Sequence, residues 1–572
     1  MSAAHGAIWC GISRPVRWGG ASNKHRGEVG GVDTLFVNGS VFDGSQYRRS
    51  LAVAVRSGRI AAIGTDLTEL RGSRTEVVDL AGGLLLPGFV DAHVHPVQGG
   101  LERARCDLAP ASGLPAYQET IARYAATHPD VPWILGGGWH QPDFPGAAPA
   151  AADLDPVTGD RPAFLVNADH HGAWVNSRAL ALAGIDARTP DPADGRIERG
   201  PDGSPTGTLH EGAMDLVGRL VPPTTHVEMV AALLDAQAYL HSLGVTGWQD
   251  AILGTYANID DATPAYVELA REGRLTARVV GALWWQRERG AEQIPELVER
   301  RDAVKFPRFR ADSVKVMQDG VAENFSAGML EPYFDGCGCR TANAGLSFVD
   351  PVELGHHVSR LDAEGFQVHL HAIGDRAVRE GLDAFETALT ENGDSDLRHH
   401  IAHLQVIHPD DIGRFAQLRV TANLQALWAM YDPQMVDLTI PFLGPERTGW
   451  QYPFGDLARS GARLAAGSDW PVSSPDPLAA VHVAVNRRQD QDMDVFLPEQ
   501  ALDLATALAA YTSGSAWLNH ADDTGRIEVG AFADLAVLDR DPFAGPHDEI
   551  AEARVRATYV EGECVFGDQS SR

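Results

Sequence analysis

Hydrophobic and polar positions alternate with two different periods along the chain, and the change of period divides it into regions. Between residues 32 and 86, stretches such as TLFVNGSVF and LAVAVRSGRIAAIG alternate with a period of two and are separated by Asn-Gly, Asp-Gly and Ser-Gly turns. This pattern is typical of β-strands. It returns over residues 520–567, in GRIEVGAFADLAVLD and ATYVEGECVFG. We therefore expect one small sheet domain assembled from both ends of the chain.

The middle of the chain, residues 87–519, alternates short apolar runs with helical patterns. Strand-like runs such as GFQVHLHA and ARLAAGSD are separated by stretches such as DRAVREGLDAFETAL, which has helical periodicity. Repeated β–α units predict a parallel sheet, and there are enough of them for a closed (β/α)8 barrel. The predicted fold class is therefore α/β, with a TIM-like barrel as its largest part.

The first barrel strand is followed by a long insertion. About 150 residues separate it from the next strand-like run, GVTGWQDA, whereas one β–α unit takes roughly 30 residues. We expect an inserted subdomain at about residues 133–240. It contains the Pro- and Ala-rich stretch QPDFPGAAPAAADLDP and a hairpin-like RIERGPDGSPTGTL.

Composition and charge narrow the class of protein. The chain has 572 residues, 44% of them hydrophobic and 22% charged, which is ordinary for a soluble globular protein. Its formal net charge of −30 disfavours nucleic acid and anionic membranes as partners. No run approaches the roughly 18 apolar residues of a membrane span.

The N-terminal residues and the cysteines bear on location. Residues 1–31 are rich in Gly and Arg without periodicity, and we expect a disordered tail or a start codon placed too early. They contain no apolar core of a secretion signal. The five cysteines are sparse and odd in number, which favours a reducing cytoplasm. The Cys337-Gly338-Cys339 pattern is expected to be incidental.

Two histidines close the first strand-like run of the middle region, GLLLPGFVDAHVHP. His93 and His95 stand two residues apart, and such residues face the same way on a strand. Two buried imidazoles side by side either share a metal ion or lose hydration without compensation. One His-x-His pair is expected by chance among 22 histidines, so the pair alone does not decide between these readings.

Other strand-like runs also carry a candidate ligand at or near their C-terminal ends. In a (β/α)8 barrel these ends meet at one mouth, so the side chains would converge there. Each has an ordinary alternative: a strand histidine is often a core residue, Asp469 could cap a helix or turn, and Lys315 could form a barrel ion pair. The candidate metal ligands are His93, His95, Lys315, His371, His403 and Asp469.

Lys315 stands out because lysine is rare in this chain. The only other lysines are Lys24 and Lys305. Lys315 lies between two valines, and burying an ammonium group costs stability. Unlike arginine, lysine loses its proton readily and forms covalent adducts. Beside two divalent cations its pKa would fall, and the free amine could take up CO2 to become a carboxylate that bridges the ions.

Together these motifs resemble the amidohydrolase superfamily, in the amidohydrolase-3 branch of YtcJ-like proteins, which includes N-substituted formamide deformylases. The resemblance covers about residues 32–567. The matching stretches are GLLLPGFVDAHVHP, DHHGAWVNSRAL, GSPTGTLHEGAMDLV, GVTGWQDA, SVKVMQDGVAENFSAGMLEPY, HLHAIGDRAV, HLQVI, AAGSDWPV and TGRIEVGAFADLAVLDRDPF. It implies a (β/α)8 barrel with a β-sandwich built from both chain ends, and a centre of one or two divalent ions, usually Zn2+.

The resemblance also implies a role for each candidate ligand. His93 and His95 would bind the first metal ion, His371 and His403 the second, and carboxylated Lys315 would bridge them. Asp469 would bind the first ion and transfer the proton. The loop after Lys315 departs mildly from the expected pattern: Ser326 stands where Thr is expected, and Glu323 and Phe325 are expected to reshape the pocket.

Candidate substrate-binding residues are harder to identify. By the family match, Asp169, His170 and His171 of the insertion line the pocket; taken alone, they are better explained as a surface group. Trp284 and Trp285 end a barrel strand and would form an aromatic wall for an apolar substituent, although core packing explains either one equally well. Other tryptophans near expected mouth loops are Trp139, Trp174, Trp428 and Trp470, and His399 and His400 are interpreted as supporting or structural residues.

The sequence therefore predicts a metal-dependent hydrolase that cleaves a C–N amide bond of a small hydrophobic N-substituted amide or formamide by metal-activated hydroxide. Asp469 and Lys315 are the expected catalytic residues. The expected partner is a small-molecule substrate, without nucleic acid or membrane, and the resemblance allows a homodimer. Two alternatives stay open: the same metal barrel running a decarboxylation, hydration or isomerisation, and a non-catalytic binding protein.

Overall fold

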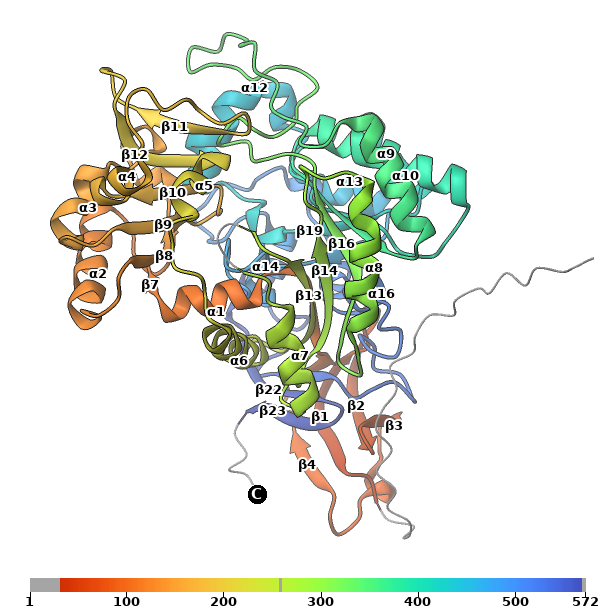
Figure 1. Ribbon diagram of the computed structural model, residues 1–572. Coiled ribbons are helices and arrows are strands. Elements are labelled where there is room, and N and C mark those ends of the chain that lie inside the picture. Colours follow the sequence, from red (N-terminus) through yellow and green to blue (C-terminus); the bar gives the residue numbers. More distant parts are fainter. Residues whose placement is uncertain (1–30, 257–259, 568–572) are drawn as a thin grey trace, which may run out of the picture.

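The computed structural model describes residues 31–256 and 260–567, which form three sheets with surrounding helices (Figure 1). The expected tail at residues 1–31 lies, apart from Gly31, outside the described residues. In Figure 1 the inserted domain lies on one side of the barrel, and the sheet built from the two chain ends lies at the bottom.

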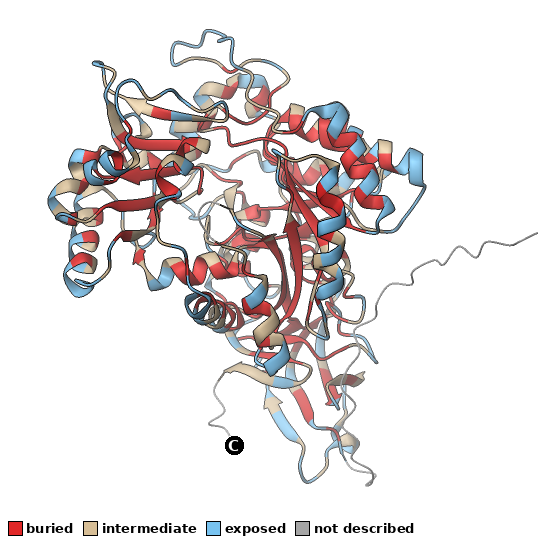
Figure 2. Cartoon of the chain, viewed as in Figure 1, coloured by how far each residue is buried: buried red, intermediate tan, exposed pale blue. Residues whose placement is uncertain are grey.

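Eight parallel strands form the central barrel. Along the sheet they are β6 (Phe89–Val94), β13 (Val245–Leu253), β14 (Arg278–Trp284), β16 (Phe309–Met317), β17 (Gln367–Ala372), β18 (His400–His403), β19 (Thr421–Leu424) and β20 (Leu464–Ala466). A short β15 (Lys305–Phe306) pairs with β16. These strands are rich in Val, Ile, Leu and Ala and are buried on both faces (Figure 2), as expected for parallel strands covered by helices.

The barrel closes between its last and first strands through the segment that follows β20. The backbone N–H of Asp469 donates to the carbonyl oxygen of His93 at 2.7 Å, and the N–H of His95 donates to the carbonyl oxygen of Trp470 at 2.9 Å. The predicted TIM-like barrel is thereby confirmed. Closure also places the loop that carries Asp469 directly against the His-x-His pair of β6.

Helices follow most barrel strands and cover the outside of the sheet. They are α1 (Pro96–Ala104), α6 (His226–Ser242), α7 (Thr263–Glu272), α8 (Ile294–Ala303), α9 (Pro351–Ala363), α10 (Asp375–Asn392), α11 (Pro409–Gln417), α12 (Ile440–Thr448), α13 (Phe454–Arg459), α14 (Pro477–Asn486), α15 (Leu504–Ala509) and α16 (Ser515–Leu518). Local sequence fixes their starts: at α6, Thr225 and Glu228 cap each other's backbone N–H groups.

The inserted domain has its own sheet and its own apolar cores. Its strands lie in the order β11 (Gly195–Arg199), β12 (Pro205–Glu211), β10 (Gly172–Val175), β9 (Ala163–Asn167), β8 (Ile134–Trp139) and β7 (Cys106–Asp107). Its helices are α2 (Leu114–Thr127), α3 (Ala151–Thr158), α4 (Ser177–Ala183) and α5 (Asp215–Gly218). The sheet thus spans residues 106–211, whereas the sequence suggested about 133–240. The sheet therefore begins before the expected range, and α6, which that range included, packs its apolar face into the barrel core.

The two chain ends meet in the third sheet. Its strands lie in the order β23 (Glu563–Gly567), β22 (Val555–Val560), β21 (Leu535–Leu538), β5 (Leu84–Pro87), β1 (Thr34–Phe42), β2 (Tyr47–Arg56) and β3 (Arg59–Gly64), and β4 (Glu76–Asp79) pairs with β1. Pairing of β21 with β5 joins the C-terminal strands to the N-terminal ones. Two apolar clusters fill this domain.

Membrane association was not expected from the sequence. In the described part of the chain, no helix combines the length and the apolarity needed to cross a bilayer. The cytoplasmic location and the homodimer stay predictions.

Candidate metal centre

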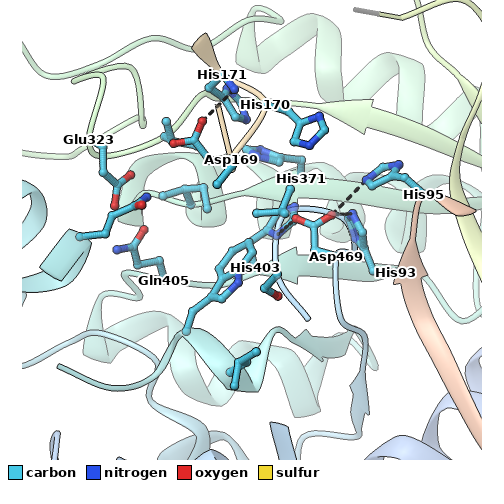
Figure 3. A pocket seen from close by; sticks show the side chains of 18 of the residues that line it. His93, His95, Asp169, His170, His171, Glu323, His371, His403, Gln405 and Asp469 are labelled. Carbon is cyan, nitrogen blue, oxygen red and sulfur yellow. Dashed lines mark hydrogen bonds and ion pairs between the residues drawn. The ribbon is translucent and has the colours of Figure 1, made fainter. Parts of the chain in front are cut away.

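The six candidate ligands meet in one cavity at the C-terminal mouth of the barrel. They come from the end of β6 and the residue after it, from β16, β17 and β18, which are adjacent in the sheet, and from the loop after β20, which closes the barrel against β6. The cavity has a volume of about 340 Å3. Figure 3 labels His93, His95, His371, His403 and Asp469, with the Asp469 carboxylate between the histidines. The full set that lines this cavity is His93, His95, Lys315, His371, His403 and Asp469.

The Asp469 carboxylate is the centre of this group. Its Oδ1 lies 3.1 Å from Nε2 of His93 and 3.0 Å from Nε2 of His95, and its Oδ2 lies 3.8 Å from Nδ1 of His403. Lys315 Nζ lies 3.3 Å from Nε2 of His93. The rings of His371 and His403 are 4.5 Å apart between centroids.

This donor set fits a divalent metal ion. Ligand atoms of His93, His403 and Asp469 lie within 4.8 Å of one another. Nδ1 of His403 is buried without a hydrogen-bond partner among the described residues. Imidazole and carboxylate ligands that converge on one point are typical of Zn2+ sites.

Burial and neighbouring side chains together hold the ligands in the charge states that metal binding requires. Burial, reinforced by Lys315, lowers the pKa of His93 to about 3, and burial also holds the pKa of His403 well below its usual range. Burial lowers the pKa of Lys315 to about 7, so a neutral amine is accessible near neutral pH. Although burial disfavours its charge, the neighbouring histidines hold the pKa of Asp469 well below its usual range.

Two further residues support these ligands and were missed in the sequence. Asp319 Oδ1 lies 3.1 Å from Nδ1 of His371, which leaves Nε2 of that ring for a metal ion. His369 Nε2 lies 2.9 Å from Nδ1 of His93. A signal existed for both: Asp319 follows Lys315 by four residues, and His369 precedes His371 by two.

Residues of the inserted domain form one wall of the cavity. Asp169, His170 and His171 all line it, as the family resemblance suggested. His171 Nδ1 lies 2.9 Å from Oε2 of Glu211, and the other oxygen of Glu211 accepts a 2.7 Å hydrogen bond from the Ser326 hydroxyl. The Ser326 hydroxyl therefore joins the loop after β16 to a buried ion pair that lies within the inserted domain.

This ion pair shifts the pKa values of both partners. Burial opposes the charge on His171, but Glu211 outweighs it and raises the pKa of His171 to about 9. Burial likewise opposes the charge on Glu211, and His171 lowers the pKa of that carboxyl to about 2. Sequence reasoning missed Glu211, since nothing in the spacing links it to a histidine forty residues earlier.

The remaining wall is apolar and aromatic, with one acidic end. Trp284 and Trp428 line the cavity. Trp285 does not; it is buried and its ring lies 4.8 Å from that of His357. Glu323 lies at the cavity end opposite His95 in Figure 3. Burial raises the pKa of Glu323 to about 7, and the carboxyl accepts a hydrogen bond from Thr439.

The other residues singled out in the sequence lie away from the cavity. Trp139 and Trp174 pack against each other in the inserted domain. Trp470 packs against Tyr239, and the His399 ring stacks on Phe385. Cys337 and Cys339 are exposed.

Comparison with known proteins places the chain in a family. The amidohydrolase family model matches residues 76–566. The chain is 32% identical over 552 residues to LONG AFTER FAR-RED 3 of Arabidopsis thaliana, covering 94% of this chain and 92% of that one. It is 30% identical over 526 residues to YtcJ of Bacillus subtilis (strain 168), with 91% and 96% covered.

A third relative and a solved structure support the same family assignment. The N-substituted formamide deformylase of Arthrobacter pascens is 28% identical over 534 residues, with 89% of this chain and 94% of that protein covered. A solved structure of an uncharacterized metal-dependent hydrolase from Pyrococcus furiosus matches with a TM-score of 0.67 at 27% identity, covering 89% of this chain and 99% of that one. The resemblance inferred from the motifs is thereby confirmed: the chain belongs to the amidohydrolase family and is a metal-dependent hydrolase.

Proposed function

We propose that this hydrolase cleaves the C–N bond of a small N-substituted amide, with a formamide as the first class to test. The observation that carries the proposal is the Asp469 carboxylate, which lies between His93, His95 and His403 at one end of a cavity with apolar walls. The similarity to an N-substituted formamide deformylase supports a formyl group as the acyl part of the proposed substrate.

The metal ligands would be His93, His95, His371, His403 and Asp469, and the ion would most plainly be Zn2+. When bound, a divalent ion acidifies water and polarises a carbonyl oxygen. A second ion would require a further bridging ligand. Lys315 would supply it as a carbamate formed with CO2, because its buried amine has a pKa of about 7.

The chain's own residues would then position the substrate and move one proton. Asp469 takes the proton of the attacking water and delivers it to the leaving nitrogen, which departs poorly as an amide anion. Its Oδ1, within 3.1 Å of two histidine nitrogens, is held still for this transfer. Trp284 and Trp428 line the space in which an apolar N-substituent would lie.

The first experiment counts metal ions per chain. Wild type, Lys315→Ala and the matched control Lys305→Ala are purified with bicarbonate and without chelator; Lys305 is exposed and pairs with Asp302. We expect close to two divalent ions in wild type and in the control, and one or none in Lys315→Ala. One ion in all three would reject the bridging role of Lys315. No ion in any, even after reconstitution, would reject the metal centre.

A substrate screen then tests the reaction. Loaded enzyme is assayed with N-alkyl and N-arylalkyl formamides, the matching acetamides, and keto or unsaturated acids. We expect kcat/KM to rise with the apolar area of the N-substituent and to fall from formamide to acetamide. Turnover of the acids with no amide hydrolysis would favour a decarboxylation, hydration or isomerisation instead.

A further inference from the structure

The His93 ring has a defined neighbour on each of its two nitrogens. Its Nε2 faces Asp469 at 3.1 Å and Lys315 at 3.3 Å, and its Nδ1 lies 2.9 Å from Nε2 of His369. We propose that His369 is a positioning residue: it accepts the Nδ1–H of His93 and so fixes the tautomer in which Nε2 of His93 binds the metal ion. This inference rests on the proposed metal centre.

The proton positions follow from the hydrogen bonds. A neutral imidazole carries one N–H, and the nitrogen that binds a metal ion must be the other one. With Nε2 of His93 directed at the ligand cluster, its N–H is on Nδ1, and Nε2 of His369 must accept it. His369 therefore carries its own hydrogen on Nδ1, which is buried without a partner among the described residues.

The tautomer of the neighbouring His400 is fixed by a hydrogen bond from Asn423. The Asn423 Nδ2 group donates to the carbonyl oxygen of Ala92 at 2.9 Å, which only the nitrogen of that amide can do. The same nitrogen lies 3.2 Å from Nδ1 of His400, so His400 accepts there and carries its hydrogen on Nε2. His400 thus makes no hydrogen bond to a metal ligand, although its ring lies 4.1 Å from that of His369.

Barrel register explains why His369 reaches this position. His369 pairs with Lys315 on one side and with His400 on the other. It precedes His371 by two residues on β17, so both side chains face the barrel interior, with His369 one layer deeper. Its ring packs edge-on against His93 at 4.6 Å between centroids, which limits rotation of both rings.

Packing alone does not account for this arrangement. His369 is completely buried, and an aliphatic residue of similar size would fill the space without burying ring nitrogens. Of the two ring nitrogens of His369, Nε2 makes a hydrogen bond, and its partner is the candidate ligand His93. Partners of this kind typically change metal affinity by about 10- to 100-fold when they are lost.

The test compares three variants of the full-length protein. His369→Leu removes the acceptor, His369→Gln offers an amide oxygen near the Nε2 position, and the matched control His400→Leu removes an equally buried imidazole whose hydrogen-bond partner is Asn423 rather than His93. Zn2+ affinity is measured by competition with a chromogenic chelator. The Co2+ absorption spectrum reports ligand geometry, and thermal denaturation of the metal-free proteins reports packing.

We expect His369→Leu to lose about 10- to 100-fold in Zn2+ affinity and to change the Co2+ spectrum. His369→Gln and His400→Leu should stay within about threefold of wild type, and His400→Leu should lower the melting temperature of the metal-free protein at least as much as His369→Leu. Affinity of His369→Leu within threefold of wild type, an equal loss in His400→Leu, or no recovery with Gln would overturn the proposal.

The design separates this inference from the proposed function. If wild type binds no divalent ion, the metal centre itself fails; if wild type binds and His369→Leu binds equally well, only the positioning role fails. Should His369→Leu not fold, His369→Asn replaces it. Asn ends its amide near the Nδ1 position, so it should lose affinity where Gln does not, and equal affinity of Asn and Gln would count against the proposal.

Discussion

Breaking the His171–Glu211 ion pair by Glu211→Gln should destabilise the protein in a pH-dependent way. The two side chains are 11% and 9% exposed and 2.9 Å apart. The rise of the His171 pKa from 6.5 to about 9 corresponds to about 3 kcal/mol, at about 1.4 kcal/mol per pH unit. The fall of the Glu211 pKa to about 2 reflects the same interaction, so its free energy is not added to that of His171.

The sign of the effect follows from proton binding. Between pH 6.5 and 9 the folded protein holds the His171 proton and the unfolded chain does not, so this contribution falls as pH rises. The stabilisation by the pair is complete between pH 4.5 and 6.5, and it is lost as pH rises through about 9. Glu211→Gln should therefore cost about 3 kcal/mol at pH 6 and less than about 1 kcal/mol at pH 9.5.

Urea denaturation followed by tryptophan fluorescence measures this difference at a series of pH values. The matched control is Glu268→Gln, which breaks an exposed pair with His226 (47% and 36% exposed side chains) and should cost less than about 1 kcal/mol at every pH. A constant difference between wild type and Glu211→Gln from pH 6 to 9.5 would show that His171 is not charged by Glu211.

Two further predictions concern catalysis and the junction between domains. Asp469→Asn should lose most turnover in steady-state assays while its circular dichroism matches wild type, and near-normal turnover would remove Asp469 from proton transfer. Arg278→Met should lower the free energy of unfolding by about 3–5 kcal/mol in urea, because it leaves Asp534 buried without its 2.7 Å partner; a loss below about 1 kcal/mol would contradict this.

The barrel and its ligand positions were accessible from the sequence because one topological rule links them. Parallel strands end at a common mouth, so His93, His371 and His403 could be grouped without knowing any distance. That rule does not extend to Glu211, which is the last residue of β12 in the inserted sheet. It meets His171 because β10 and β12 of the inserted sheet pair antiparallel, with Gly172 opposite His210, and the sequence does not reveal this pairing.

The depth of each side chain along the barrel axis was a second property that could not be predicted from the sequence. The spacing of His369 and His371 places both on the inner face of a strand. Only the register with β16 shows that the deeper one is level with Lys315 and within reach of His93. Strand spacing therefore identifies which face a residue takes, and register decides whether it supports a ligand.

The backbone conformation at the barrel mouth is a third property that the sequence did not predict, and it affects which substitution of Asp469 should be tested. Asp469 has φ of 57° and His403 has φ of 80°, in the left-handed region that residues other than glycine seldom adopt. Such conformations cost roughly 1–3 kcal/mol each and concentrate at functional sites. Asp and Asn tolerate them better than Ala does. An Asp469→Ala variant would thus change the backbone and the carboxylate together, whereas Asp469→Asn keeps the turn and changes only the carboxylate, which is both the proton carrier and a proposed metal ligand.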